Sequence, residues 1–257
     1  MIALVRVSGQ VEPAGSRDRA GGSRTHRIAS VGHELADGLR MSVRHRVMRR
    51  LMIFVLVTGT AEGVFGTLFA PFVRHVLHGS SQAYGLAAAA QAIGGIAGGL
   101  LAASLGQRVR ASRLLSAGAV AFGAVDLAIF LYPLGYVAVW PAIAGMVLVG
   151  LPGAMTTAGL ITLFQRNTGD SYRGRVFGAC GAMEGVAIVA GIMAAGYLGQ
   201  AAGIIPVLAF QGAAYVLAGL GMLAALRGEG KAEPFPSPVG ISGQPQPTQD
   251  AGHVTRA

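Results

Sequence analysis

The stretch GVAIVAGIMAAGYLGQAAGIIPVLAFQGAAYVLAGLGMLAAL, residues 185–226, contains no charged side chain. A helix that crosses a bilayer needs roughly 20 predominantly apolar residues, so this stretch is long enough for two crossings. The segment Gly203-Ile-Ile-Pro206 supplies the break between them. Residues 82–107 and 127–165 are also free of charge. Because soluble core helices are shorter than these stretches, the sequence predicts an integral membrane protein and excludes a soluble domain.

The composition of the whole chain agrees with this interpretation. Of its 257 residues, 53% are apolar and 12% are charged, whereas soluble domains carry roughly 25% charged residues. We expect an all-α membrane protein with a mostly disordered, polar cytoplasmic segment (1–40), a transmembrane domain (41–226) and a disordered cytoplasmic tail (227–257). The six predicted spans are 51–73, 83–106, 114–132, 137–164, 176–200 and 204–226.

Arginine placement predicts the orientation, because basic residues concentrate on the cytoplasmic side of membrane proteins. With the N-terminus inside, the cytoplasmic flanks hold Arg44, Arg46, Arg49, Arg50, Arg108, Arg110, Arg113, Arg166, Arg173, Arg175, Arg227 and Lys231, and the external loops hold Arg74. We therefore expect a multi-pass protein of the cell (plasma or inner) membrane with both termini in the cytoplasm. The net charge of +9 comes largely from these flanks, so the expected partner is the lipid bilayer and not a nucleic acid.

Small residues recur inside the spans at spacings that suit helix packing. The segment Gly94-Gly95-Ile-Ala-Gly98-Gly99 contains two overlapping pairs of glycines four residues apart, and the fifth span repeats the pattern. In lipid, such residues let helix backbones approach closely enough for van der Waals contact. Tight packing is the simplest interpretation, and seams along which helices slide during a conformational cycle are the alternative.

Three acidic residues, Glu62, Asp126 and Glu184, lie inside predicted spans. At about 1.5 Å per residue, each is roughly 12–18 Å from the cytoplasmic end of its span, near the middle of a hydrocarbon layer about 30 Å thick. A charge at that depth costs on the order of 2.5–3.5 kcal/mol. Since no lysine or arginine lies inside a span, each acid is expected to be protonated or to face a water-filled cavity.

Two interpretations of these acids stay open. A neutral carboxyl can simply hydrogen-bond to a neighbouring helix, or the acid can bind a proton or another cation in a transport pathway. We favour the pathway for Glu62 and Glu184 and the structural role for Asp126. Uncharged polar residues at depth are Gln91, Thr156, Thr157, Thr162 and Gln211. Gln91 is a further cavity candidate, whereas the threonines more often bond back to carbonyls of their own helix.

The sequence lacks the motifs of membrane-embedded enzymes. None of the six histidines lies inside a predicted span, and there is no His-Glu-x-x-His pair for a metalloprotease. A phosphate-binding G-x-x-x-x-G-K-[ST] loop is also absent. Cys180 is the only cysteine of the chain, so an intrachain disulfide is excluded. We expect no enzymatic activity, no cofactor and no metal site.

Several segments resemble those of a known family. Residues 38–50, GLRMSVRHRVMRR, resemble the end of the central cytoplasmic loop of major facilitator superfamily transporters, in particular the drug- and siderophore-exporter branch. The eighth helix of that branch resembles the segment Gly85 to Gly99. The junction that leads into its eleventh helix resembles Arg173-Gly174-Arg175-Val-Phe-Gly178. In the family's loop motif G-x-x-x-D-R-x-G-R-R, the matching residues here are Gly99, Gly106 and Arg108. Ala103 and Ser104 replace the acidic and first basic positions, so the motif's salt bridge is not expected.

The resemblance covers residues 33–226 and implies the C-terminal half of a twelve-helix transporter. The six spans would be helices seven to twelve, arranged as two inverted three-helix repeats. Helices seven, eight, ten and eleven surround the central cavity of that fold. This arrangement would place Glu62, Gln91, Thr156, Thr157 and Glu184 near the pathway, and Asp126 on a peripheral helix.

The resemblance leads to two hypotheses about function. The first is a secondary, proton-coupled exporter of a small organic compound, whose six-helix bundle needs a second copy of itself or a separate N-terminal half. The second is a six-helix membrane interaction protein without transport activity, or an inactive transporter fragment. The discriminating feature is whether Glu62 and Glu184 line a hydrated cavity or are packed away.

Overall fold

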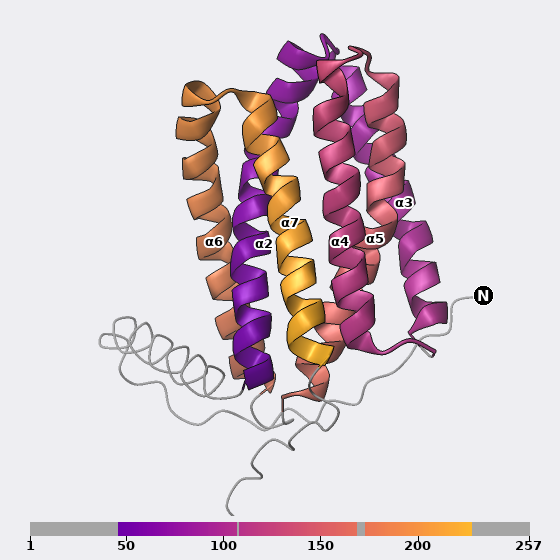
Figure 1. The fold of residues 1–257 in the computed structure, drawn as a ribbon, viewed down its shortest axis with the longest axis vertical. Coiled ribbons are helices and arrows are strands. Elements are labelled where there is room, and N and C mark those ends of the chain that lie inside the picture. The colour runs from indigo at the N-terminus through magenta and orange to yellow at the C-terminus, as the bar shows by residue number, and fades with distance from the viewer. Residues whose placement is uncertain (1–45, 107, 169–172, 228–257) are drawn as a thin grey trace, which may run out of the picture.

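The computed structural model describes residues 46–106, 108–168 and 173–227, and its described part consists of helices and short connections (Figure 1). The long helices are α2 (Arg46–Pro71), α3 (Ser81–Leu105), α4 (Ala111–Leu131), α5 (Trp140–Arg166), α6 (Arg173–Ala201) and α7 (Ile204–Arg227). Within the described residues, six helices are long and apolar enough to cross a membrane. The predicted all-α membrane fold is therefore confirmed. The expected segment 1–40 and the tail beyond Arg227 lie outside the described residues.

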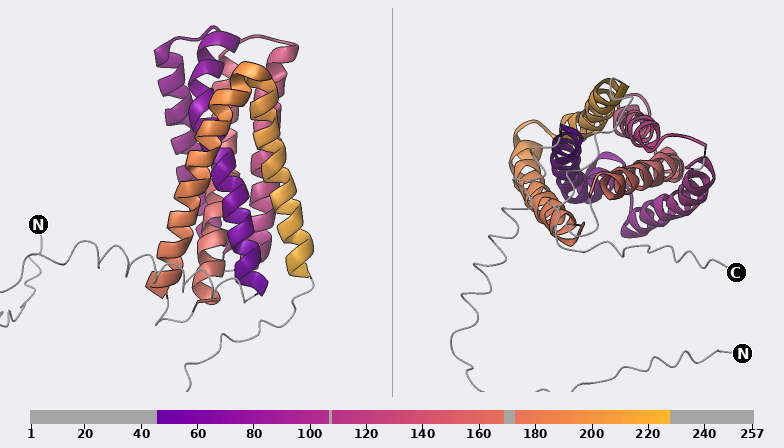
Figure 2. Two further views of the ribbon diagram at one scale, coloured as in Figure 1. Left: turned by 90° about the vertical axis from the view of Figure 1, so that its left-hand side faces the viewer. Right: turned by 90° about the horizontal axis from the view of Figure 1, so that it is seen from below.

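The helices pack as an elongated bundle with two helices at its margins. Helix α2 packs against α6 and α7, α5 packs against α3 and α4, and α4 also packs against α7. Seen along the bundle, α4 and α7 lie along one side, and α6 and α3 lie at the two ends (Figure 2). In α3 and α6, 28% of the most apolar stretch is buried, against 56% in α2 and in α4. The two end helices therefore have the most surface left to cover.

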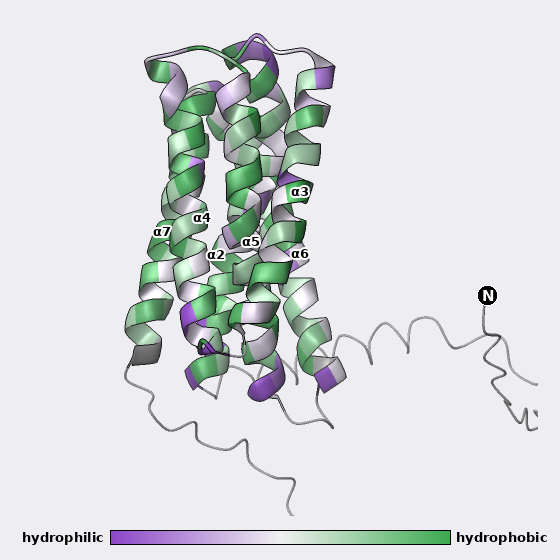
Figure 3. Cartoon of the chain, turned by 90° about the vertical axis from the view of Figure 1, so that its right-hand side faces the viewer, coloured by the Kyte–Doolittle hydropathy of each residue, from purple (hydrophilic) through white to green (hydrophobic). Residues whose placement is uncertain are grey.

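Apolar and polar residues are distributed as a bilayer requires. Hydrophobic residues predominate along the length of the bundle, and the hydrophilic ones gather mainly near its ends (Figure 3). Exposed apolar side chains include Ile96 and Leu100 of α3 and Met193 and Tyr197 of α6. In water such a surface would be unfavourable, whereas in hydrocarbon it is the surface that a spanning bundle presents.

The first span is longer than the sequence predicts, and it does not end at residue 73. Helix α2 contains Pro71 and continues as a π-helical turn, η1 (Phe72–Val76). Proline has no N–H with which to continue the regular hydrogen-bond pattern. The following turn is wider, and the Leu77 N–H donates to the Phe72 carbonyl at 3.1 Å. Arg74 and His75, predicted to lie in a loop, are therefore part of this turn.

The other boundaries differ by a few residues, for a common reason. Helices α2 and α6 begin earlier than predicted, at Arg46 and Arg173, because their first turns carry arginines that a hydropathy pattern leaves out of the span. The connection predicted between the spans 114–132 and 137–164 begins with a short 3-10 helix, η2 (Tyr132–Leu134). The break before the last span is a turn at Gly203, whose φ of +90° favours glycine.

Glycines lie where helix backbones touch. A Cβ on Gly94 of α3 would collide with the Val147 carbonyl of α5, and one on Gly98 would lie 2.5 Å from the Leu151 carbonyl oxygen. In the α2–α6 seam, a Cβ on Gly63 would collide with the Ile188 carbonyl, and one on Gly191 with the Thr60 carbonyl. The small-residue pattern is thus a packing device in these seams.

Gly94→Ala is expected to destabilise the protein, whereas Gly95→Ala is not. The added methyl group at residue 94 must displace the backbone of α5, and overpacking of this kind costs about 1–3 kcal/mol. At Gly95, one residue further along, a Cβ would have nothing within 4 Å. Thermal unfolding of the two purified variants in detergent checks this. Equal melting temperatures for both variants would contradict the close backbone contact of α3 with α5 at Gly94.

Candidate functional site

An acid and an amide are buried together between α4 and α7. Asp126 of α4 is 1% exposed and Gln211 of α7 is 2% exposed. The Gln211 Nε2 donates a hydrogen bond to Asp126 Oδ2 at 2.9 Å. The other polar atom of the amide, Gln211 Oε1, is buried and has no hydrogen-bond partner within the described structure.

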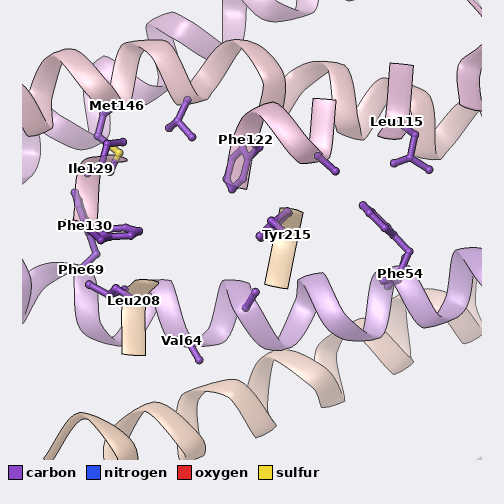
Figure 4. Packing of buried hydrophobic residues seen from close by; sticks show 14 of the residues in the cluster. Phe54, Val64, Phe69, Leu115, Phe122, Ile129, Phe130, Met146, Leu208 and Tyr215 are labelled. Carbon is purple, nitrogen blue, oxygen red and sulfur yellow. The ribbon is translucent and has the colours of Figure 1, made fainter. Parts of the chain in front are cut away.

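A second acid is held from the same face of α7. The Tyr215 hydroxyl donates to Glu62 Oε1 of α2 at 2.6 Å. Tyr215 is buried, and its ring packs on Phe122 of α4 with centroids 4.5 Å apart. Figure 4 shows Tyr215 among the core side chains that α2, α4 and α7 contribute. Because Gln211 and Tyr215 are four residues apart, they project from one face of α7. That face thus holds both acids through separate hydrogen bonds.

Glu62 differs from Asp126 in its access to the surface. Glu62 is exposed, although Val55 and Phe69, seven residues away on the same helix face, are buried. The exposed residues Ile53 and Val57 lie on another face of α2, where they line an apolar groove of about 530 Å³ formed with α7. Glu62 therefore does not open into that groove. Residue 62 follows Ile53 by nine positions, or about two and a half helical turns, so it lies on the opposite face of α2.

The third acid lies on α6 beside the same stretch of α2. A Cβ added to Gly59 would lie 3.6 Å from Glu184 Cγ and 3.1 Å from Ala187 Cβ, so Glu184 borders this glycine contact. Glu184 is exposed, and its carboxylate is close enough to Glu62 for the two to repel. In the described residues, the arginines and histidines lie at the helix ends. The acids are therefore grouped without a basic side chain among them.

The uncharged candidates lie elsewhere. Thr156 is buried against Gly118 of α4 and donates to the Pro152 carbonyl of its own helix at 2.8 Å. Thr157 is exposed and donates to Gly153 O at 3.1 Å. Gln91 is half-buried on α3, and its backbone carbonyl oxygen faces Gly150 of α5. The structure does not bring these three side chains into the group of acids.

The residues of the loop motifs lie in the last turns of α3, in the connection after it and in the first turn of α6. Gly99, Gly106, Arg108, Arg173 and Gly174 are all exposed. Gly106 is the C-cap of α3, and its N–H donates to the Ala102 carbonyl. Arg175 lies in the first turn of α6, and its side chain falls outside the described part of the structure.

Tyr215 is a candidate site residue that the sequence alone does not single out. It lies in an apolar stretch, Gln211-Gly-Ala-Ala-Tyr215, where a tyrosine resembles any core aromatic. A signal was present in the spacing, because a polar-tipped residue four positions from a buried glutamine lies on the same helix face. A buried tyrosine hydroxyl also normally has a hydrogen-bond partner.

Comparison with known proteins gives one match. The family model described as Major Facilitator Superfamily matches residues 51–249, which include all but the first turn of the described bundle. No curated protein and no solved structure matches the chain.

Proposed function

Because the chain belongs to the major facilitator superfamily, we propose that it is one six-helix half of a proton-coupled secondary transporter that exports a small organic compound. Members of this family are transporters of small solutes and not enzymes. Proton coupling, export and the need for a second bundle are the parts that we propose for this chain.

The single observation that supports proton coupling is the position of Glu62. This acid lies in the middle of a membrane helix, accepts a hydrogen bond from Tyr215 and is nevertheless exposed. A carboxyl group is tolerated at such depth when it is protonated or wetted by a cavity, and proton relays in transporters use such groups. With a second bundle enclosing an aqueous pathway on that side, an exposed acid can exchange its proton with water, which a packed acid cannot.

A second bundle is proposed because the two end helices are under-packed. Several glycines of α6 have nothing within 4 Å of where a Cβ would lie: Gly174, Gly181, Gly185 and Gly196. On α3 the same holds for Gly85, Gly95 and Gly99. Small residues of this kind suit contact with a further helix. We propose that a second copy of the bundle supplies those helices and closes the pathway around Glu62.

The direct test is an efflux assay combined with crosslinking. Cells that express the chain are loaded with a fluorescent dye, and dye loss is followed with and without an imposed proton gradient. Gradient-dependent efflux together with a crosslinked dimer supports the proposal. Well-inserted protein that moves no dye of a chemically varied panel, alone or with an upstream partner half, would favour the alternative of a non-transporting membrane interaction protein.

A further inference from the structure

We propose that Asp126 and Gln211 form a second proton-binding site, separate from Glu62 and coupled to it. The site lies between α4 and α7, whereas Glu62 is on α2. Its role in a transport cycle rests on the proposed function, whereas its ability to hold a proton does not.

The unpartnered atom of Gln211 carries the argument. Gln211 is 2% exposed, and its Nε2 is bonded to Asp126 while its Oε1 has no partner. An ionised carboxylate only accepts hydrogen bonds, so it cannot satisfy an amide oxygen. A protonated Asp126 has an O–H to donate to Oε1, and its other oxygen keeps the bond from Nε2. A single proton would therefore satisfy every polar atom of the pair.

The groups around Asp126 also favour a proton there. From α7 it faces Gln211 and Tyr215, and its electrostatic neighbour on α2 is the acid Glu62, which in turn is repelled by Glu184 of α6. The only charged residue of α5, which also packs on α4, is Arg166 at its C-terminal end. Since every titratable neighbour is an acid or a phenol, the described surroundings offer no positive charge to an ionised Asp126.

Tyr215 connects the two sites. Its hydroxyl donates to Glu62, and it interacts electrostatically with Glu62, Asp126 and Glu184. Two nearby carboxylates resist being ionised together. When Asp126 holds a proton, Glu62 is free to be ionised and to accept the Tyr215 hydrogen. When Glu62 takes a proton from water, Asp126 can release its own, so that loading one acid favours unloading of the other.

Infrared spectroscopy of the purified protein at neutral pH tests this proposal. We expect a carbonyl stretch of a protonated carboxyl group that shifts when the protein is labelled with ¹³C at the aspartate carboxyl. The label assigns the band without any substitution, so the test does not depend on a variant folding. The other aspartates of the chain lie outside the described helices, at sequence positions expected to be in water and ionised. Absence of a label-sensitive band in the wild type would overturn the proposal.

Two variants sharpen the test. Asp126→Asn should remove the band and still fold, because its amide can accept from Nε2 and donate to Oε1 of Gln211. Gln211→Leu should move the band to higher frequency, because the acid loses its amide partner. Gln200→Leu, at the exposed end of α6, is the matched control and should leave the band unchanged. A band that persists in Asp126→Asn, or that ignores Gln211→Leu, would overturn the assignment.

The experiment separates this proposal from the proposed function. It needs neither a substrate nor a second bundle. A band that behaves as described in a protein without efflux would leave the proton site standing and remove the transport role. Proton-driven efflux without the band would leave the transport role standing and remove the proton site at Asp126. Glu62→Gln should keep the band at neutral pH and lower the pH at which it is lost on alkaline titration, because the neighbouring negative charge that opposes ionisation of Asp126 is gone.

Discussion

Glu62→Gln is expected to reduce proton-driven efflux to the background level while leaving the amount of inserted protein unchanged. Glutamine keeps the size of the side chain, and its carbonyl oxygen can still accept the Tyr215 hydrogen bond, which measures 2.6 Å in the wild type. What it loses is the ability to take up and release a proton. The effect should therefore appear in transport and not in folding. Initial efflux rates at several external pH values, normalised to membrane-inserted protein, are the measurement.

A matched control lies one turn away on the same helix. Gly66→Ala adds a methyl group where nothing lies within 4 Å, so efflux and its pH profile should stay at the wild-type level. Glu184→Gln should also lose pH dependence if both exposed acids serve the pathway. If Glu62→Gln and Glu184→Gln both transport with the wild-type pH profile, proton coupling through this group of acids is wrong.

Gly191→Leu is expected to prevent the bundle from folding, whereas Gly185→Leu should leave the bundle intact and abolish transport. At Gly191, a side chain would collide with the Thr60 carbonyl of α2, and the neighbouring Gly63 Cα would lie at 3.1 Å. At Gly185, six residues earlier on α6, the space is open. The bulky residue there should instead obstruct the second bundle, if that bundle packs against the open glycines of α6.

The two glycine variants are compared by thermal unfolding and by crosslinking in membranes. Gly191→Leu should yield little folded protein. Gly185→Leu should unfold at the wild-type temperature of the isolated bundle but give less crosslinked dimer and no efflux. A normal dimer and normal efflux from Gly185→Leu would show that the open glycines of α6 do not face a partner.

Much of the architecture is predictable from the sequence because a bilayer imposes strong constraints. Uncharged stretches such as residues 185–226 fix the number of spans, since each crossing needs a set length of apolar residues. Span ends are harder to predict because helices continue beyond the apolar stretch on arginine-bearing turns, as α6 does from Arg173. The π turn after Pro71 was not predicted, because hydropathy carries no information on hydrogen-bond register.

The candidate site is only partly predictable, because it depends on how each helix is rotated about its axis. The depth of Glu62 and Asp126 follows from counting residues, but nothing in the counting shows that α7 holds both acids through Tyr215 and Gln211. Apolar residues surround every face of these helices, so periodicity does not reveal which face is inward. The structural role favoured for Asp126 stays one interpretation, and the unsatisfied Gln211 oxygen now supports a second one.

The central claim is that water reaches Glu62 in the middle of the membrane, and cysteine labelling tests it most directly. The single natural cysteine is first replaced, as Cys180→Ser, and Glu62→Cys is then introduced and exposed to a membrane-impermeant, water-soluble thiol reagent. We predict labelling of this variant, and none when Asp126→Cys is introduced in its place, because Asp126 is 1% exposed. If the residue-62 cysteine stays unlabelled in folded protein while Arg74→Cys, exposed in the turn after Pro71, reacts, Glu62 has no aqueous access and the proposed mechanism is contradicted.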